Sequence, residues 1–237
     1  MTGSVEVRAA GDSALVVELG TELDPALNAR VIACAAALRG ERIRGVRDVI
    51  SSYAAVTVCY DPLRTDLGAL TGALTRHAVA ADVGVNAAPR VHEVPVCYGG
   101  VHGPDLELVA DFAGCSADEV ARRHSETPYR VYLLGFVPGF AYLGRVDERI
   151  AMPRRKTPRT TVPAGAVGIA GGQTGVYPCP TPGGWQLIGR TPMRVFDAAR
   201  DEPFLFAPGD EVCFVPIDEV TLLASLDEDE VGTAPGA

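Results

Sequence analysis

The stretch that decides the fold is GFVPGFAYLGRVDERIAMPRRKTPRTTVPAGAVGIAGGQTGVYPCPTPGGWQLIGRTPM, residues 135–193. It holds 11 glycines and 8 prolines, yet apolar and aromatic residues are interleaved along its whole length. A disordered linker lacks such side chains, because it has too little apolar surface to form a core. Short strands joined by tight, shaped loops fit this composition, so the stretch predicts a β-barrel or β-sandwich.

The segments around this stretch extend the same unit. Upstream, VHEVPVCY (91–98) predicts an opening strand, and downstream PGDEVCFVPI (208–217) predicts a turn and a closing strand. Between them we expect a short helix that Asp105 caps, and a second helix that starts at a capping box, Ser116 to Glu119, and runs to about His124. The sequence therefore predicts a mainly-β barrel domain over residues 89–237, with a disordered tail from about residue 227.

The first 88 residues have a different pattern, in which strands and helices alternate. Strands are expected at residues 5–9, 14–19 and 46–60, and helices at 24–40 and 67–78. Asp24 followed by Pro25 indicates the start of the first helix, and Gly40 indicates its end. We expect a small α+β sandwich, with the helices on one side of an antiparallel sheet, and a linker over residues 80–90.

The charge is distributed unevenly. The net charge is −9, but residues 197–237 hold 11 acids and one base, and residues 145–159, here called the basic loop, hold six bases and two acids. An acidic chain argues against general nucleic-acid binding. No apolar run reaches the ~20 residues that span a bilayer, and the amino terminus lacks a signal-peptide pattern, so we expect no membrane association and a cytoplasmic protein.

Metal and nucleotide signatures are missing from the sequence. The six cysteines lie far apart without a CxxC pair, and the four histidines show no metal-ligand spacing. We therefore expect reduced thiols and no metal site. There is also no P-loop, no GxGxxG after a strand and no GxSxG elbow.

Three features could carry chemistry, and each has a structural alternative. The basic loop offers arginines for a carboxylate or phosphate, or it is a solvated surface loop. The glycines of GIAGGQTG (168–175) let backbone amides approach an anion, or they form a tight turn. His124 at a helix end is favoured in its protonated form, or it caps the last carbonyls. The aromatic group of Phe136, Phe140, Tyr142 and Trp185 is predicted as core, with at most one or two members lining a pocket.

Three long motifs, in order, carry a family resemblance: YRVYLLGFVPGFAYLG (129–144), PRRKTPRTTVPAGAVGIAGGQTGVYP (153–178) and PGGWQLIGRTP (182–192). They resemble the allophanate hydrolase subunit 1 domain family, which includes the B subunit of bacterial ATP-dependent 5-oxoprolinase and the kinase inhibitor KipI. The resemblance implies an α+β amino-terminal domain followed by a cyclophilin-like barrel.

The resemblance also implies an activity, partners and a cofactor. The expected function is that of the 5-oxoprolinase B subunit, in an enzyme that opens 5-oxoproline to glutamate with ATP. The expected partners are a subunit 2-type protein (the oxoprolinase C subunit) and a third protein, the oxoprolinase A subunit, with ATP bound mainly by a partner. Two alternatives stay open: a KipI-like inhibitor of a sensor histidine kinase, and a carboxyltransferase component that acts on urea-type amides with biotin.

Lactam opening through a phosphorylated oxygen needs cations for phosphate and carboxylate and donors for an oxyanion. We therefore expect a site completed across a subunit interface. Its predicted catalytic residues are His124, Lys156 and Gln173. Its predicted substrate- or anion-binding residues are Arg154, Arg155, Arg159, Gly171, Gly172 and Trp185.

Overall fold

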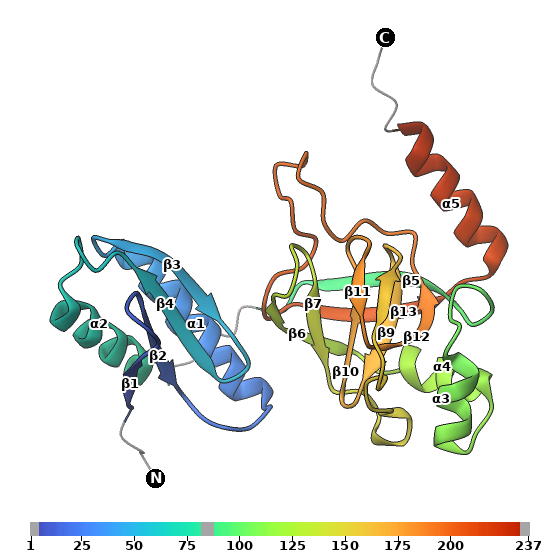
Figure 1. The fold of residues 1–237 in the computed structure, drawn as a ribbon, viewed down its shortest axis with the longest axis horizontal. Helices are drawn as coiled ribbons and strands as arrows, with labels where there is room; N and C mark the ends of the chain where they lie inside the picture. The colour runs from blue at the N-terminus through green and yellow to red at the C-terminus, as the bar shows by residue number, and fades with distance from the viewer. Residues whose placement is uncertain (1–4, 82–87, 233–237) are drawn as a thin grey trace. The chain divides into compact units, whose positions relative to one another are not determined.

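The structure is a computed structural model that describes residues 5–81 and 88–232, and side chains as far as residue 226 (Figure 1). The chain divides into two compact units, Met1–Pro89 and Arg90–Ala237. Residues 82–87, most of the linker expected from the sequence, lie outside the described residues.

The first unit is a four-stranded antiparallel sheet with two helices. Its strands are β1 (Val7–Ala9), β2 (Ala14–Glu18), β3 (Val46–Ser51) and β4 (Ala55–Tyr60), in the order β1-β2-β4-β3. Its helices are α1 (Pro25–Glu41) and α2 (Leu67–Ala80). Alternation puts Leu15 and Val17 of β2 into one core with Leu38 of α1 and Leu70 of α2. The strands and helices predicted for this unit are all present.

The helix ends of this unit follow from local chemistry. The Asp24 carboxylate accepts the backbone N–H of Leu27 at 2.7 Å, and Pro25 occupies the first turn, as the sequence predicts. The predicted end at Gly40 is wrong by one residue. The helix runs to Glu41, and Arg42 takes the left-handed conformation, with φ at 49°.

The second unit is built on a closed barrel of seven strands in the order β10-β7-β6-β13-β5-β12-β9, so the predicted mainly-β barrel is confirmed. The strands are β5 (Val91–Tyr98), β6 (Tyr129–Leu134), β7 (Ala141–Gly144), β9 (Ala166–Ala170), β10 (Gln173–Val176), β12 (Gln186–Arg190) and β13 (Glu211–Pro216). The pair β5 and β13 is parallel, and the other pairs are antiparallel.

Shorter elements surround the barrel. They are the two-stranded sheet of β8 (Arg159–Val162) and β11 (Thr181–Gly183), the 3₁₀ turn η1 (Glu148–Ile150), and the helices α3 (Leu106–Ala113), α4 (Ala117–Ser125) and α5 (Glu219–Gly232). The Ser116 hydroxyl accepts the Glu119 N–H at 3.2 Å, which confirms the predicted start of α4. The disordered tail predicted from residue 227 is wrong as far as Gly232, because α5 extends to that residue.

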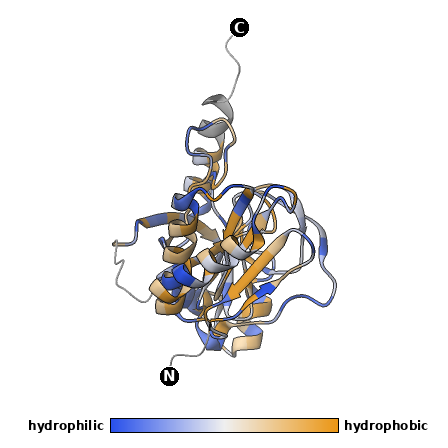
Figure 2. Cartoon of the chain, turned by 90° about the vertical axis from the view of Figure 1, so that its left-hand side faces the viewer, coloured by the Kyte–Doolittle hydropathy of each residue, from blue (hydrophilic) through white to orange (hydrophobic). Residues whose placement is uncertain are grey.

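Alternation along the strands separates two layers in the second unit. Val167 and Ile169 of β9 point into the barrel core with Val176 and Ile188. Figure 2, which colours the chain by hydropathy, shows hydrophobic and hydrophilic residues on both the helices and the strands. No helix in the described residues has the length and apolar composition needed to cross a bilayer.

Candidate functional site

A second apolar layer lies on the outer face of the barrel. Ala166 and Ala170 of β9 point away from the interior and pack with a cluster that includes Phe140, Tyr177 and Trp185. The partly buried Tyr142 packs against the same cluster. The outer face of β7, β10 and β9 is therefore covered by aromatic rings rather than by solvent.

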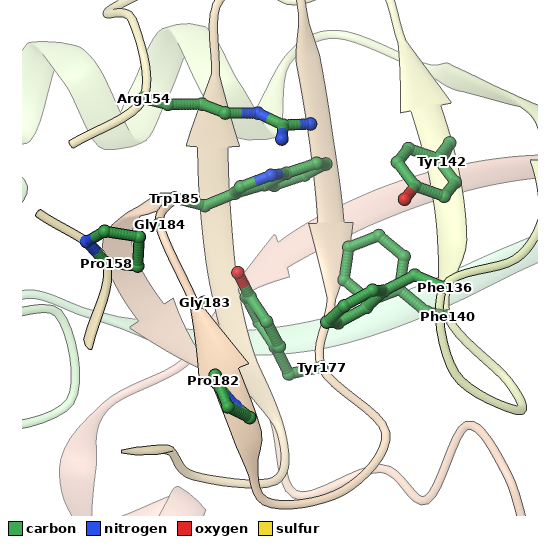
Figure 3. Close-up of a pocket in the computed structure, with 10 residues that line it drawn as sticks. All are labelled: Phe136, Phe140, Tyr142, Arg154, Pro158, Tyr177, Pro182, Gly183, Gly184 and Trp185. Carbon is green, nitrogen blue, oxygen red and sulfur yellow. The ribbon is translucent and has the colours of Figure 1, made fainter. Parts of the chain in front are cut away.

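These rings surround a cavity of about 230 Å³, which we call the aromatic pocket (Figure 3). Its lining comes from the loop between β6 and β7, from β7, from the basic loop, from the residue after β10, and from β11 with the two residues that lead into β12. The lining residues are Phe136, Phe140, Tyr142, Arg154, Pro158, Tyr177, Pro182, Gly183, Gly184 and Trp185. The prediction that at most one or two of the four predicted core aromatics line a pocket is wrong, because all four do.

The rings meet edge to face, the arrangement that the aromatic quadrupole favours. The Phe140 ring centroid lies 4.9 Å from Tyr142 and 5.2 Å from both Tyr177 and Trp185. Gly175 leaves room for the rings and for the neighbouring strand, because a Cβ there would lie 2.7 Å from the Ala141 carbonyl oxygen, 3.2 Å from the Phe140 ring and 3.3 Å from the Trp185 ring. Close packing at this position therefore requires a glycine.

Tyr177 supplies a polar group to this apolar lining. Burial raises the pKa of Tyr177 and outweighs the backbone of Trp185 and the charges of Arg154 and Arg159, which all act in the opposite direction. The hydroxyl thus keeps its proton at neutral pH and can donate it in a hydrogen bond.

Arg154 is the lining residue with a formal charge. Its guanidinium carbon lies 5.8 Å from the centroid of the Trp185 ring, a cation–π contact. Among the described residues, it makes no ion pair within 4.0 Å. Its charge is therefore available to an anion.

Arg155 and Arg159, in contrast, already hold a carboxylate. Both donate to Asp105 Oδ1, at 2.9 Å and 2.7 Å, and the Leu187 N–H donates to Asp105 Oδ2 at 2.7 Å. Asp105 occupies the N-cap position of α3 as predicted, but its side chain makes no capping bond because these partners use it. Two cations share one buried anion, so the group keeps one positive charge.

The other predicted residues of this region lie apart from the pocket lining. Lys156 is exposed on the basic loop. Gln173 begins β10 and pairs with Gly144 and Ala170, two residues from Gly175 on the outer face. Gly171, with φ at 59°, donates its N–H to the Met152 carbonyl at 2.8 Å, so this amide serves a turn. The Gly172 carbonyl accepts the Val146 N–H at 3.0 Å.

His124 lies inside the barrel and is fully buried. Its Nε2 and the Thr174 hydroxyl are 2.8 Å apart, and its Nδ1 and the Tyr98 hydroxyl are 2.8 Å apart. The predicted preference for a protonated ring is wrong, because burial lowers the pKa of His124 to about 3. The role in catalysis stays a prediction, but nothing in this placement brings His124 to the aromatic pocket.

Of the predicted site residues, the structure thus brings Arg154 and Trp185 together in the aromatic pocket. Tyr177 and Asp105 were not predicted as site residues. The one signal for Tyr177 was its position at the end of a glycine-rich strand, where alternation continues the outer face. Asp105 gave a signal for capping only, because its partners lie about 50 residues further along the chain.

Known proteins share both the sequence and the fold of this chain. The family model for the carboxyltransferase domain, subdomain C and D, matches residues 5–206. The chain is 42% identical over 231 residues to the 5-oxoprolinase B subunit of Bacillus subtilis, covering 92% of this chain and 95% of that relative. It is 58% identical over 130 residues to the protein of the same name from Escherichia coli O157:H7, covering 55% of this chain and 60% of the relative.

The similarity extends to solved structures. The chain aligns with the crystal structure of TTHA0988 at a TM-score of 0.77 and 38% identity, over 90% of this chain and 40% of that one. It aligns with the Kluyveromyces lactis urea amidolyase at a TM-score of 0.82 and 22% identity, over 96% of this chain and 16% of that one. It thus spans less than half of either of these chains. The match of the family model and the identity to relatives along most of their length establish that this chain belongs to the carboxyltransferase domain family, subdomain C and D.

Proposed function

We propose that this chain is the B subunit of an ATP-dependent 5-oxoprolinase, the enzyme that opens the lactam of 5-oxoproline to glutamate. The observation that carries the proposal is 42% identity to a protein of that name along nearly the whole of both chains. The barrel, with a charged pocket on its outer face, offers a place for a small ligand.

The chemistry needs groups that this chain has and groups that it lacks. A lactam is a stable amide, and phosphorylation of its oxygen makes ring opening feasible. Arg154 offers a positive charge for a carboxylate, and Tyr177 offers a hydrogen-bond donor. The sequence has no P-loop and no GxGxxG after a strand, so we propose that ATP is bound mainly by the partner proteins.

We further propose that the site is completed by a subunit 2-type partner (the C subunit) and by a third protein (the A subunit), and that the chain alone does not turn over substrate. The aromatic pocket is on a surface, and Phe136 at its lining is 60% exposed. The same fold is part of longer chains in the urea amidolyase and TTHA0988 alignments. Both observations favour a domain that works next to others.

The test is reconstitution. This chain is purified with the products of its neighbouring genes, and ATP-dependent formation of glutamate from 5-oxoproline is measured with and without it. We expect glutamate only when the chain is present. An intact complex that contains the chain and forms no glutamate would refute the oxoprolinase proposal.

A second candidate is a carboxyltransferase component that acts on a urea-type amide. The description of the family as a carboxyltransferase domain favours it. The two functions separate in one comparison, because carboxyl transfer needs a biotin-carrying partner and bicarbonate, whereas lactam opening needs neither. Transfer of labelled bicarbonate to urea by the purified complex would favour this candidate.

A further inference from the structure

We propose that the aromatic pocket, in this chain alone, binds a small flat carboxylic acid that carries a carbonyl acceptor away from its carboxylate. Arg154 binds the carboxylate and the Tyr177 hydroxyl donates to the carbonyl. The proposal deepens the proposed function, since 5-oxoproline has both groups, and it rests on that function for the choice of probe.

The charge of the pocket selects an anion. Arg154 is a lining residue whose charge has no ion-pair partner among the described side chains, and none of the ten lining residues is acidic. The Arg155, Arg159 and Asp105 group adds one more positive charge, and the charge of Arg159 reaches Tyr177. A cationic ligand, which aromatic pockets also bind, is disfavoured because Arg154 already lies over Trp185.

The shape of the pocket selects a small, flat molecule. Five of the ten lining residues are aromatic, and the β11 edge adds Gly183, which has no side chain. The cavity of about 230 Å³ lies below the roughly 300–1,000 Å³ that sites for drug-sized ligands occupy. A five-membered ring with two substituents matches this size, whereas a complete nucleoside triphosphate does not.

The two polar groups lie on different sides of Trp185. In Figure 3, Arg154 runs along one side of the indole and the Tyr177 hydroxyl lies on the other. Burial keeps the Tyr177 hydroxyl protonated, so this group has a proton to donate to a ligand. The arrangement therefore suits a ligand that spans the edge of the indole, with an anion at one end and a carbonyl oxygen at the other.

Trp185 is the one tryptophan in the sequence, so its fluorescence reports on this pocket without engineering. The full chain, without partners, is titrated with 5-oxoproline, with cyclopentanecarboxylate (carboxylate but no lactam carbonyl) and with 2-pyrrolidinone (lactam but no carboxylate). We expect saturable quenching or enhancement by 5-oxoproline, and affinity lower by roughly tenfold or more for each of the others.

Arg154→Met removes the charge and keeps much of the stem, and we expect it to weaken 5-oxoproline binding by roughly tenfold to hundredfold. Arg90→Met is the matched control, because Arg90 is also exposed, belongs to the same unit and does not line the pocket. We expect that control to bind like the unmodified chain. Circular dichroism and the thermal midpoint check that both variants fold.

Equal binding by Arg154→Met and the unmodified chain would overturn the proposal, as would a fluorescence response to ATP and none to 5-oxoproline. Absence of binding to the folded chain would overturn it too. If the reconstituted complex still forms glutamate in that case, the oxoprolinase function stands and only the placement of the substrate fails. If the chain binds 5-oxoproline but no complex forms glutamate, the pocket stands and the assigned reaction fails.

Discussion

Phe136 holds a backbone conformation that only glycine adopts without cost. Its φ is 71°, the residue is 60% exposed, and its ring packs edge to face on Phe140, with centroids 5.7 Å apart. The left-handed region costs a residue with a Cβ about 1–2 kcal/mol. An exposed aromatic ring kept at such a cost suggests selection for a contact at the pocket mouth rather than for stability.

Two substitutions separate the strain from the ring. Phe136→Gly and Phe136→Ala both remove the ring, but only the glycine relieves the strain. We expect the glycine variant to be more stable than the alanine variant by about 1 kcal/mol, and both to lose 5-oxoproline-dependent turnover to a similar degree. Urea unfolding and the glutamate assay measure the two effects. Full turnover in both variants would contradict a role for the ring.

His124 links the stability of the barrel to pH. The Thr174 hydroxyl donates to the Gly168 carbonyl at 3.0 Å, so it accepts from Nε2–H, and the Tyr98 hydroxyl donates to Nδ1. Protonation would add a hydrogen at Nδ1, where it would face the hydrogen of the Tyr98 hydroxyl. It would also place a positive charge in a fully buried site. The neutral ring is therefore the form that the fold requires.

This gives a pH prediction with a definite sign. The folded pKa is about 3 and the unfolded reference is 6.5, so the unfolded chain binds a proton that the folded chain refuses, and stability falls as pH drops below 6.5. We expect the unmodified chain to lose about 1.5–2 kcal/mol more than His124→Gln between pH 6.5 and 5. Urea unfolding at the two pH values measures this, and parallel losses in the two proteins would refute it.

At the residue scale, the sequence indicated Arg154 and Trp185 as site residues. It did not indicate that the arginines of the basic loop have different roles. Arg154, Arg155 and Arg159 are equivalent as letters in a sequence. Only the fold distinguishes them, because Asp105 reaches two of the three from about 50 residues away. A contact between residues so far apart in the sequence cannot be predicted from local spacing.

Among the elements, Asp105 fastens the basic loop to the barrel. It stands before the first turn of α3, accepts from β12 at Leu187 and binds two arginines of the loop. It is 4% exposed, so its charge is stabilised by these partners rather than by water. The loop position, and with it the position of Arg154, depends on this carboxylate.

Asp105→Asn removes the charge while it keeps the shape. We expect a loss of about 2–4 kcal/mol in the free energy of unfolding, at the lower end because both arginines are partly exposed, and weaker 5-oxoproline binding through Arg154. Asp111→Asn in the same helix is the control, because Asp111 is exposed, and we expect no change. Equal stability of the two variants would show that the carboxylate does not fasten the loop.

Helix starts and strand alternation were predictable, because capping and alternation are local. Asp24, Ser116 and the alternation of β2 and β4 are examples. The strand order of the barrel was not predictable, since it depends on pairs such as β5 with β13, in which Val94 lies beside Phe214. The cyclophilin-like character of that barrel stays a prediction from the resemblance.

For the molecule as a whole, the two units have separate hydrophobic cores. The cluster of the first unit contains buried residues from Leu15 to Ala78, and the two clusters of the second contain residues from Val94 to Phe214. Each unit thus has its own apolar core, of the kind that lets a domain fold alone. The aromatic pocket is lined entirely by residues of the second unit.

We therefore expect residues 88–237, expressed alone, to fold cooperatively and to keep the pocket. The expected results are a single urea transition followed by Trp185 fluorescence, and 5-oxoproline affinity within about threefold of the full chain, since every lining residue is retained. The same fragment with Asp105→Asn should unfold at lower urea, which tests whether the fragment uses the native contacts. The fragment could instead be unfolded, or it could fold but bind more than about tenfold more weakly than the full chain. Either result would mean that the first unit stabilises the barrel, and that the units divided at residue 89 do not fold independently. If it folds and binds but cannot replace the full chain in a reconstituted complex, the first unit acts in assembly or turnover, not in ligand binding.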